Sequence, residues 1–214
     1  MVNLTWIVFD ILGTVAFAVS GAMVGITKRM DIFGIAVLAI LTAIGGGITR
    51  DLIVGVNPPS AFQNPTDFML AITFAFIVSI IYGFDWLRER KKNYLKILFD
   101  ISDTLGLAAF TVTGALVGLN QAAGNYVLAV VLGTLTAVGG GILRDVMAQR
   151  LPVVFYADFY AAAAILGAVA LCLAEKILGD LNVASWIGFF TAAALRFLAI
   201  HFSWSLYHPK KGAT

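Results

Sequence analysis

The sequence predicts an all-α membrane protein with seven transmembrane helices. Of its 214 residues, 60% are hydrophobic and only 12% are charged, whereas a soluble domain usually carries about 25% charged residues. So little polar surface cannot cover a water-soluble globule. The apolar runs are about 20 residues long, which is the length that an α-helix needs to cross a bilayer.

Seven apolar runs are predicted to span the membrane. Short turns rich in Gly, Asn and Pro separate them, and none of these turns is long enough to be a domain of its own. The predicted spans are Leu4–Thr27, Ile32–Val56, Asp67–Leu87, Ile101–Leu119, Asn125–Met147, Tyr156–Ile177 and Val183–Phe202.

The distribution of basic residues predicts the orientation of the chain. If the N-terminus lies outside, 11 of the 14 Lys and Arg residues fall on the segments at the cytoplasmic side. Cytoplasmic loops carry such an excess of positive charge. We therefore expect the N-terminus outside and the C-terminus inside.

The chain contains an internal repeat. The stretch Asp10–Gly25 (DILGTVAFAVSGAMVG) aligns without gaps with Asp103–Gly118 (DTLGLAAFTVTGALVG), and Gly45–Asp51 (GGGITRD) aligns with Gly139–Asp145 (GGGILRD). Because each copy holds three spans, an odd number, the second copy enters the membrane from the opposite side. Such inverted repeats are a recurrent plan of transport proteins. The predicted units are two three-helix repeats, 1–97 and 98–180, and a seventh helix with a short tail, 181–214.

Each copy places three consecutive glycines inside a predicted span. Glycine weakens a helix, so spans 2 and 5 are predicted to kink or unwind there and to offer backbone carbonyls as cation ligands. Close packing against a neighbouring helix is the alternative explanation. The triplets are Gly45, Gly46, Gly47 and Gly139, Gly140, Gly141; a separate set of glycines at four-residue spacing predicts packing faces on spans 1 and 4, namely Gly21, Gly25, Gly114 and Gly118.

An arginine and an aspartate follow each triplet. Arg50 and Arg144 come three residues after the last glycine, and an arginine inside the membrane costs about 2.5–3.5 kcal/mol, so it marks a pathway by default. Asp51 and Asp145 lie next to them, but neighbours on a helix point about 100° apart. These adjacent pairs are therefore not expected to be ion pairs.

The symmetry of the repeat suggests other partners for the arginines. Asp10 and Asp103 stand at the start of the aligned stretches and are predicted to pair with Arg50 and Arg144. The two pairs would form charged constrictions on either side of a central cavity. The alternative is that both arginines reach the lipid headgroups from helix ends.

The remaining ionisable residues carry weaker signals. Arg196 and His201 in span 7 could line a path, but we interpret both as anchors at the membrane end. No nucleophile–base pair, metal-ligand cluster or phosphate-binding loop of recognisable spacing occurs in the sequence. An enzyme is therefore not expected, nor is a cofactor, and the net charge of +2 gives no reason to expect nucleic acid as a partner.

At these residues the sequence resembles the trimeric intracellular cation (TRIC) channel family, in particular its bacterial and archaeal members. The resemblance covers nearly the whole chain, and its most specific part is the doubled GGG-x2-RD motif. It implies a homotrimer with one pore in each subunit, lined by spans 2 and 5 and kinked at the glycines. It also implies that monovalent cations such as K+ permeate, and that the basic residues near the kinks, Arg50 and Arg144, gate the pore.

Two departures from the animal members point to a prokaryotic plasma membrane surrounded by its lipids. Animal members carry a Lys-Glu-Val stretch where this chain has Arg50, Asp51 and Leu52, and the C-terminus HPKKGAT shows no clear retention signal. The residues alone leave a second function open, a secondary transporter of a small solute such as an amino acid. A structural membrane protein without a pathway does not account for the doubled glycines and arginines.

Overall fold

A computed structural model describes residues 4–83, 91–156 and 159–204, and every regular element in them is helical. Seven of these helices are long and apolar enough to cross a membrane, as predicted. A one-turn helix follows α2 and another follows α6. In chain order the helices are α1 (Leu4–Thr27), α2 (Ile32–Ile53), α3 (Ser60–Gln63), α4 (Thr66–Gly83), α5 (Lys91–Gln121), α6 (Tyr126–Met147), α7 (Val153–Tyr156), α8 (Tyr160–Leu178) and α9 (Leu181–His201).

The helix ends follow from local sequence signals. Asp31 caps α2 by accepting a hydrogen bond from the Gly34 amide at 2.7 Å, and Asn125, 94 residues later, caps α6 in the same way. Such caps stabilise a helix by about 1 kcal/mol. The largest difference from the predicted ends is at α5, which begins ten residues before the predicted Ile101. Its polar first turns contain good helix formers, so the helix extends beyond the apolar run.

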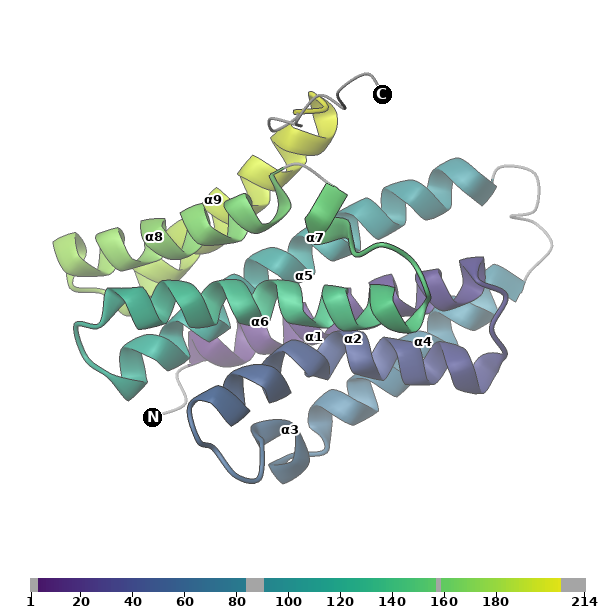
Figure 1. Cartoon of the computed structure of the whole chain (residues 1–214), viewed down its shortest axis with the longest axis horizontal. Helices are drawn as coiled ribbons and strands as arrows, with labels where there is room; N and C mark the ends of the chain where they lie inside the picture. The colour runs from purple at the N-terminus through teal and green to yellow at the C-terminus, as the bar shows by residue number, and fades with distance from the viewer. Residues whose placement is uncertain (1–3, 84–90, 157–158, 205–214) are drawn as a thin grey trace, which may run out of the picture.

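The packing of the helices follows the two-copy pattern. Helix α1 packs on α2 and α4, and α5 packs in the same way on α6 and α8. These sets are called the first unit and the second unit. The units meet through α1 against α5 and α2 against α6, so each helix at this boundary contacts its own repeat counterpart. Figure 1 shows α2 and α6 running side by side across the middle of the molecule.

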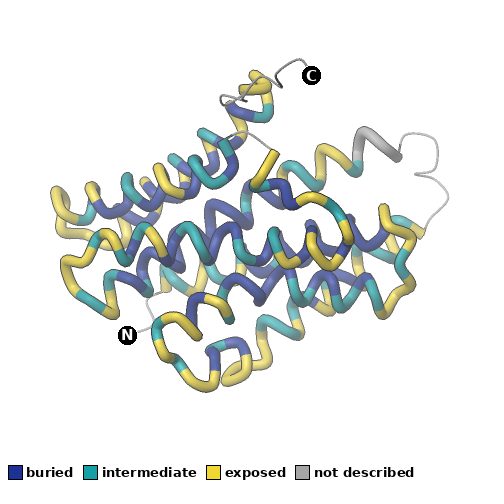
Figure 2. Tube along the Cα trace, viewed as in Figure 1, coloured by how far each residue is buried: buried dark blue, intermediate teal, exposed yellow. Residues whose placement is uncertain are grey.

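The contact between α1 and α5 is reciprocal. Phe17 lies against Gly106, and Phe110 lies against Gly13, 93 residues before Gly106. A methyl group on Gly13 would come within 2.6 Å of the Phe110 ring. The two rings also meet edge to face, with centroids 5.2 Å apart. This buried centre is the dark stretch along α1, α5 and α6 in Figure 2.

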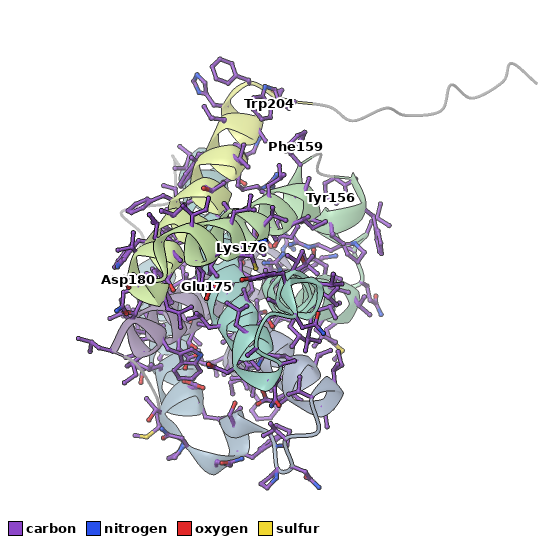
Figure 3. All side chains as sticks on the ribbon, turned by 90° about the vertical axis from the view of Figure 1, so that its left-hand side faces the viewer. Tyr156, Phe159, Glu175, Lys176, Asp180 and Trp204 are labelled. Carbon is purple, nitrogen blue, oxygen red and sulfur yellow. The ribbon has the colours of Figure 1, made fainter. Side chains whose placement is uncertain are left out.

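Helix α9 breaks this symmetry. It packs chiefly on α8 and α5 of the second unit, whereas the counterpart helices α4 and α1 have no such covering helix among the described residues. Accordingly α4 buries only Ala71 and Ala75. Figure 3 shows α8 and α9 side by side, with Glu175, Lys176 and Asp180 at one end of the pair and Phe159 and Trp204 at the other. The rings of Phe159 and Trp204 are in contact, with centroids 5.2 Å apart.

The glycines spaced by four residues lie where helices approach closely. Gly21 faces Ala39 and Thr42 of α2, and Gly25 faces Ile35. In the second unit, Gly114 faces Gly133 and Thr136 of α6, and Gly118 faces Ala129.

We expect Gly118→Ala to destabilise the protein more than Gly25→Ala. A methyl group on Gly118 would lie 2.5 Å from the Ala129 Cα atom, whereas on Gly25 its nearest neighbours, both in Ile35, would be 3.1 Å away. Overpacking that moves a backbone costs about 1–3 kcal/mol. Thermal unfolding of the two variants in detergent measures the difference, and equal midpoints would contradict it.

Candidate functional site

The two glycine triplets lie against each other at the centre of the molecule. A methyl group on Gly46 would come closer than 3.0 Å to the carbonyl oxygen of Thr136, and one on Gly140 would come equally close to the carbonyl oxygen of Thr42. A methyl group on Gly139 would lie 3.2 Å from the Gly46 Cα atom. We call this backbone-to-backbone contact of α2 and α6 the glycine crossing. The triplets thus allow close packing of α2 against α6, the alternative explanation given for them above.

Both helices stay α-helical through their triplets. Residues 32–53 and 126–147 form uninterrupted helices, and the Gly45 carbonyl accepts a hydrogen bond from the Thr49 hydroxyl at 2.8 Å. The predicted unwinding and the bared carbonyls are therefore not found. The reason is that the glycine crossing buries the backbone that glycine leaves without side-chain cover. The backbone N–H and C=O groups there are satisfied by the helical hydrogen bonds and need no other partner. A bend at the triplets stays a prediction.

Arg144 is fully buried and joins three helices. Its Nε donates to Asp145 at 2.7 Å, and its Nη1 donates to Asp103 of α5 at 2.5 Å. The same nitrogen donates to the Ser20 hydroxyl of α1, which itself donates to Asp103 at 3.2 Å. We call this cluster the Arg144 site. It ties α1, α5 and α6 together.

A second layer closes the Arg144 site on one side. Asp145 accepts two hydrogen bonds from Arg150, at 2.6 and 2.9 Å, and one from the Val153 amide at the start of α7. The Phe99 ring lies beneath both guanidinium groups, 4.9 Å from that of Arg144 and 5.3 Å from that of Arg150. Two arginines and two aspartates are thus packed together with no net charge. A buried cation is tolerated when it is paired in this way.

Arg50 is also buried, but its partners are local. Its Nε donates to Asp51 at 2.8 Å, and its Nη2 lies 3.4 Å from the Ser60 hydroxyl. Asp51 in turn accepts hydrogen bonds from the Ser60 amide and hydroxyl, at 2.8 and 2.5 Å. Asp51 therefore holds the first turn of α3 as Asp145 holds that of α7.

The expectation that the adjacent arginine and aspartate would not pair is wrong in both repeats. Arg50 forms an ion pair with Asp51, and Arg144 forms one with Asp145, each at 2.7 Å. The angle between neighbours on a helix fixes only the direction of the first side-chain bond. The long arginine side chain curls back, so its Nε reaches the carboxylate beside it.

The two arginines differ in their contact with the first aspartate of the repeat. Arg144 pairs with Asp103, but no ion pair joins Arg50 to Asp10 in the described part of the chain. Instead, Asp10 and Arg50 line a common polar cavity together with Ser60 and Asp67. We call it the Asp10 cavity. The remaining residues around it are Thr14, Ala43, Ile44, Gly47, Ala61 and Phe110.

The polar residues of these sites that the sequence prediction missed include Ser20, Ser60, Asp67 and Arg150. Ser20 and Ser60 each bridge an arginine and an aspartate, but a serine in an apolar helix or turn carries no distinctive signal. Asp67 was predicted only as the start of span 3. A carboxylate at the first turn of an apolar span was a signal that could have identified it.

Arg196 lies inside the bundle, so its interpretation as a membrane-end anchor is wrong. Only 7% of its surface is exposed, and its guanidinium carbon lies 4.9 Å from the centre of the Tyr160 ring. His201 is exposed at the last residue of α9.

Known proteins match nearly the whole chain. The matching family model is described as "Glycine transporter" and covers two segments, residues 7–83 and 100–176. The UPF0126 inner membrane protein YadS of Escherichia coli (strain K12) is 33% identical over 201 residues, covering 94% of this chain and 93% of YadS. The UPF0126 membrane protein YvgT of Bacillus subtilis (strain 168) is 34% identical over 204 residues, covering 95% and 96%.

The fold also matches a solved structure. The TRIC trimeric intracellular cation channel orthologue from Rhodobacter sphaeroides superposes with a TM-score of 0.84 at 31% identity, covering 94% of this chain and 100% of that one. The resemblance predicted from the doubled GGG-x2-RD motif is confirmed.

Proposed function

The chain belongs to the glycine transporter family of membrane proteins and has the fold of the prokaryotic TRIC channels, and from this premise we propose that it is a channel for monovalent cations. Each subunit would hold its own pathway. The solved neighbours are channels and not enzymes.

The observation that carries this proposal is the charge of the Asp10 cavity. An arginine in a pathway repels cations, but Arg50 is neutralised by its ion pair with Asp51. Asp10 and Asp67 also face the cavity, and neither forms an ion pair within the described residues. Acidic side chains around a pore select cations, and a cleft of one charge sign concentrates the opposite ion.

The proposed pathway leads from the Asp10 cavity past the glycine crossing to the Arg144 site. In this state the Arg144 site is closed, because the guanidinium bridges α1, α5 and α6. Opening requires Arg144 to leave Asp103 and Ser20. Its pairing with Asp145 can persist, as that of Arg50 with Asp51 does beside the Asp10 cavity.

The assembly and membrane placement complete the proposal. We expect a homotrimer, as in the R. sphaeroides neighbour, which is a trimeric channel, and a bacterial plasma membrane with the N-terminus outside. Cross-linking in the membrane and labelling of terminal tags from each side test these points.

Replacing both cavity carboxylates is expected to reduce K+ conductance. In a planar bilayer at low salt, the D10N/D67N variant should pass about tenfold less current than the parent, because the cavity no longer concentrates cations. The difference should shrink at 1 M salt, where charge is screened. Asp31→Asn is the matched control, since Asp31 caps α2 and does not line the Asp10 cavity. An unchanged current at low salt would contradict the proposal.

A transporter of a small zwitterion is the second candidate function. The Asp10 cavity presents a guanidinium and two carboxylates to one space, and these groups complement the carboxylate and the ammonium of an amino acid. The description of the matching family model agrees with this alternative. Reconstituted protein separates the two: unitary K+ currents favour the channel, whereas saturable, gradient-coupled glycine uptake without unitary currents favours the transporter.

A further inference from the structure

The two ends of the proposed pathway are formed by equivalent positions of the repeat, but these positions carry different residues. Helix α4 begins at Thr66 and α8 begins at Tyr160, 94 residues later, which is the offset of the glycine triplets. The side chain of Thr66 is exposed, and its hydroxyl donates a hydrogen bond to Asn64. Tyr160 is 2% exposed. At the position where the first unit has an exposed threonine, the second unit therefore has a buried tyrosine.

The hydroxyl of Tyr160 points at the Arg144 site. It lies 3.1 Å from the position that a methyl group on Gly141 would take, and the Nη2 of Arg144 lies 3.5 Å from the same point. Neither of these two atoms has a hydrogen-bond partner among the described residues. Buried polar atoms without partners disfavour a state, and water that enters on opening would satisfy them. The closed arrangement therefore needs a contact that offsets this cost.

Arg196 supplies a contact of that kind. Its guanidinium lies over the Tyr160 ring at 4.9 Å from the ring centre, and both side chains are buried. A cation over an aromatic face is attracted to it, most strongly where water is excluded. Arg196 belongs to α9, the helix that covers the second unit and has no counterpart over the first within the described parts of the chain.

We infer that Arg196 is a positioning residue through which α9 holds Tyr160 against the Arg144 site and keeps that end of the pathway closed. The inference rests on the proposed function to the extent that the pathway passes the Arg144 site. It gives the seventh helix a regulatory role: movement of α9 away from α8 would release Tyr160 and let water reach Arg144 and Ser20.

The test measures access of water to Ser20. A cysteine replaces Ser20 in a Cys172→Ala background, and a charged, membrane-impermeant thiol reagent is applied to the purified protein. Arg196→Leu is expected to raise the labelling rate about tenfold, the effect of losing one desolvated cation–aromatic contact. Arg196→Lys, which keeps a cation over the ring, should stay near the parent rate. Phe190→Leu, an exposed position on the same helix, is the matched control and should not change the rate.

Two further measurements decide whether Arg196 acts through Tyr160. Tyr160→Leu should raise the rate by a similar factor, and the R196L/Y160L variant should label no faster than either single variant. A cysteine at Ala75, which is buried in α4 of the first unit, reports general unfolding and should label equally slowly in all backgrounds. An unchanged rate in Arg196→Leu, fully additive effects, or faster labelling at Ala75 would overturn the inference.

This readout is independent of the transported species. Labelling reports whether the Arg144 site opens, whichever solute passes. Absence of K+ current with the expected labelling pattern would overturn the proposed function alone. Normal K+ current with unchanged labelling in Arg196→Leu would overturn the inference alone.

Discussion

Replacing Asp103 with alanine is expected to lower the free energy of unfolding by about 3–5 kcal/mol, the cost of breaking a buried ion pair by removing one partner. Arg144 is fully buried, and Asp103 is its acceptor on α5. Without Asp103, both Arg144 and Arg150 depend on the single carboxylate of Asp145. The cluster would then carry an uncompensated positive charge inside the bundle.

The repeat provides a matched control for this experiment. Asp10 is the counterpart of Asp103 in the first unit but forms no ion pair with Arg50 in the described structure, so Asp10→Ala should cost much less stability. A double-mutant cycle of Asp103→Ala with Arg144→Met, measured by reversible unfolding in mixed detergent, should show strong coupling. Equal losses in Asp103→Ala and Asp10→Ala would contradict the asymmetry between the two sites.

Gly46→Ala is expected to destabilise the protein about as much as Asp103→Ala. We expect it to lower the free energy of unfolding by about 3 kcal/mol, at the upper end of overpacking effects. The methyl would collide with the Thr136 carbonyl of α6, and the backbone of a packed helix cannot move aside cheaply. Gly140→Ala should behave alike, because it collides with the Thr42 carbonyl. Thermal stability of the purified protein measures both variants.

Gly47 is the control within the same triplet. A methyl group there would meet only the Arg50 guanidinium, at 3.7 Å, and alanine favours a helix by about 1 kcal/mol over glycine. Gly47→Ala should therefore keep or raise the midpoint of unfolding. If Gly46→Ala were as stable as Gly47→Ala, the glycine crossing would not be a tight contact.

The fold could be predicted from the sequence because its signals are repetitive and local. Apolar runs of membrane-spanning length and a two-fold repeated motif define seven helices and their pairing. The response of the backbone to three glycines could not be predicted in the same way. Each triplet is buried by a threonine of the other helix, Gly46 by Thr136 and Gly140 by Thr42. Only the packing of the two helices shows that a glycine run here permits close approach and leaves the helix intact.

The difference between the two arginines shows where a symmetric motif stops being informative. Both sites carry the same Arg-Asp pair, but Asp51 meets a serine at the start of α3, whereas Asp145 meets a valine at the start of α7. The Ser60 hydroxyl also engages Arg50. In the second unit Asp145 also forms an ion pair with Arg150, and Arg144 forms a further ion pair with Asp103. Neighbours outside the motif thus decide the pairing.

The reciprocal contacts across the centre have a consequence for how this chain can work. Phe17 on Gly106 with Phe110 on Gly13, and Gly46 on Thr136 with Gly140 on Thr42, form the contact pattern of a two-fold symmetric homodimer. In a true homodimer of one three-helix protein, the two ends of the proposed pathway would be chemically identical. Joining the two halves in one chain allows them to differ, so the first unit has the acidic Asp10 cavity whereas the second unit has the buried Arg144 with Tyr160 beside it. Covalent fusion of the two repeats thus allows the two ends of the proposed pathway to differ in chemistry.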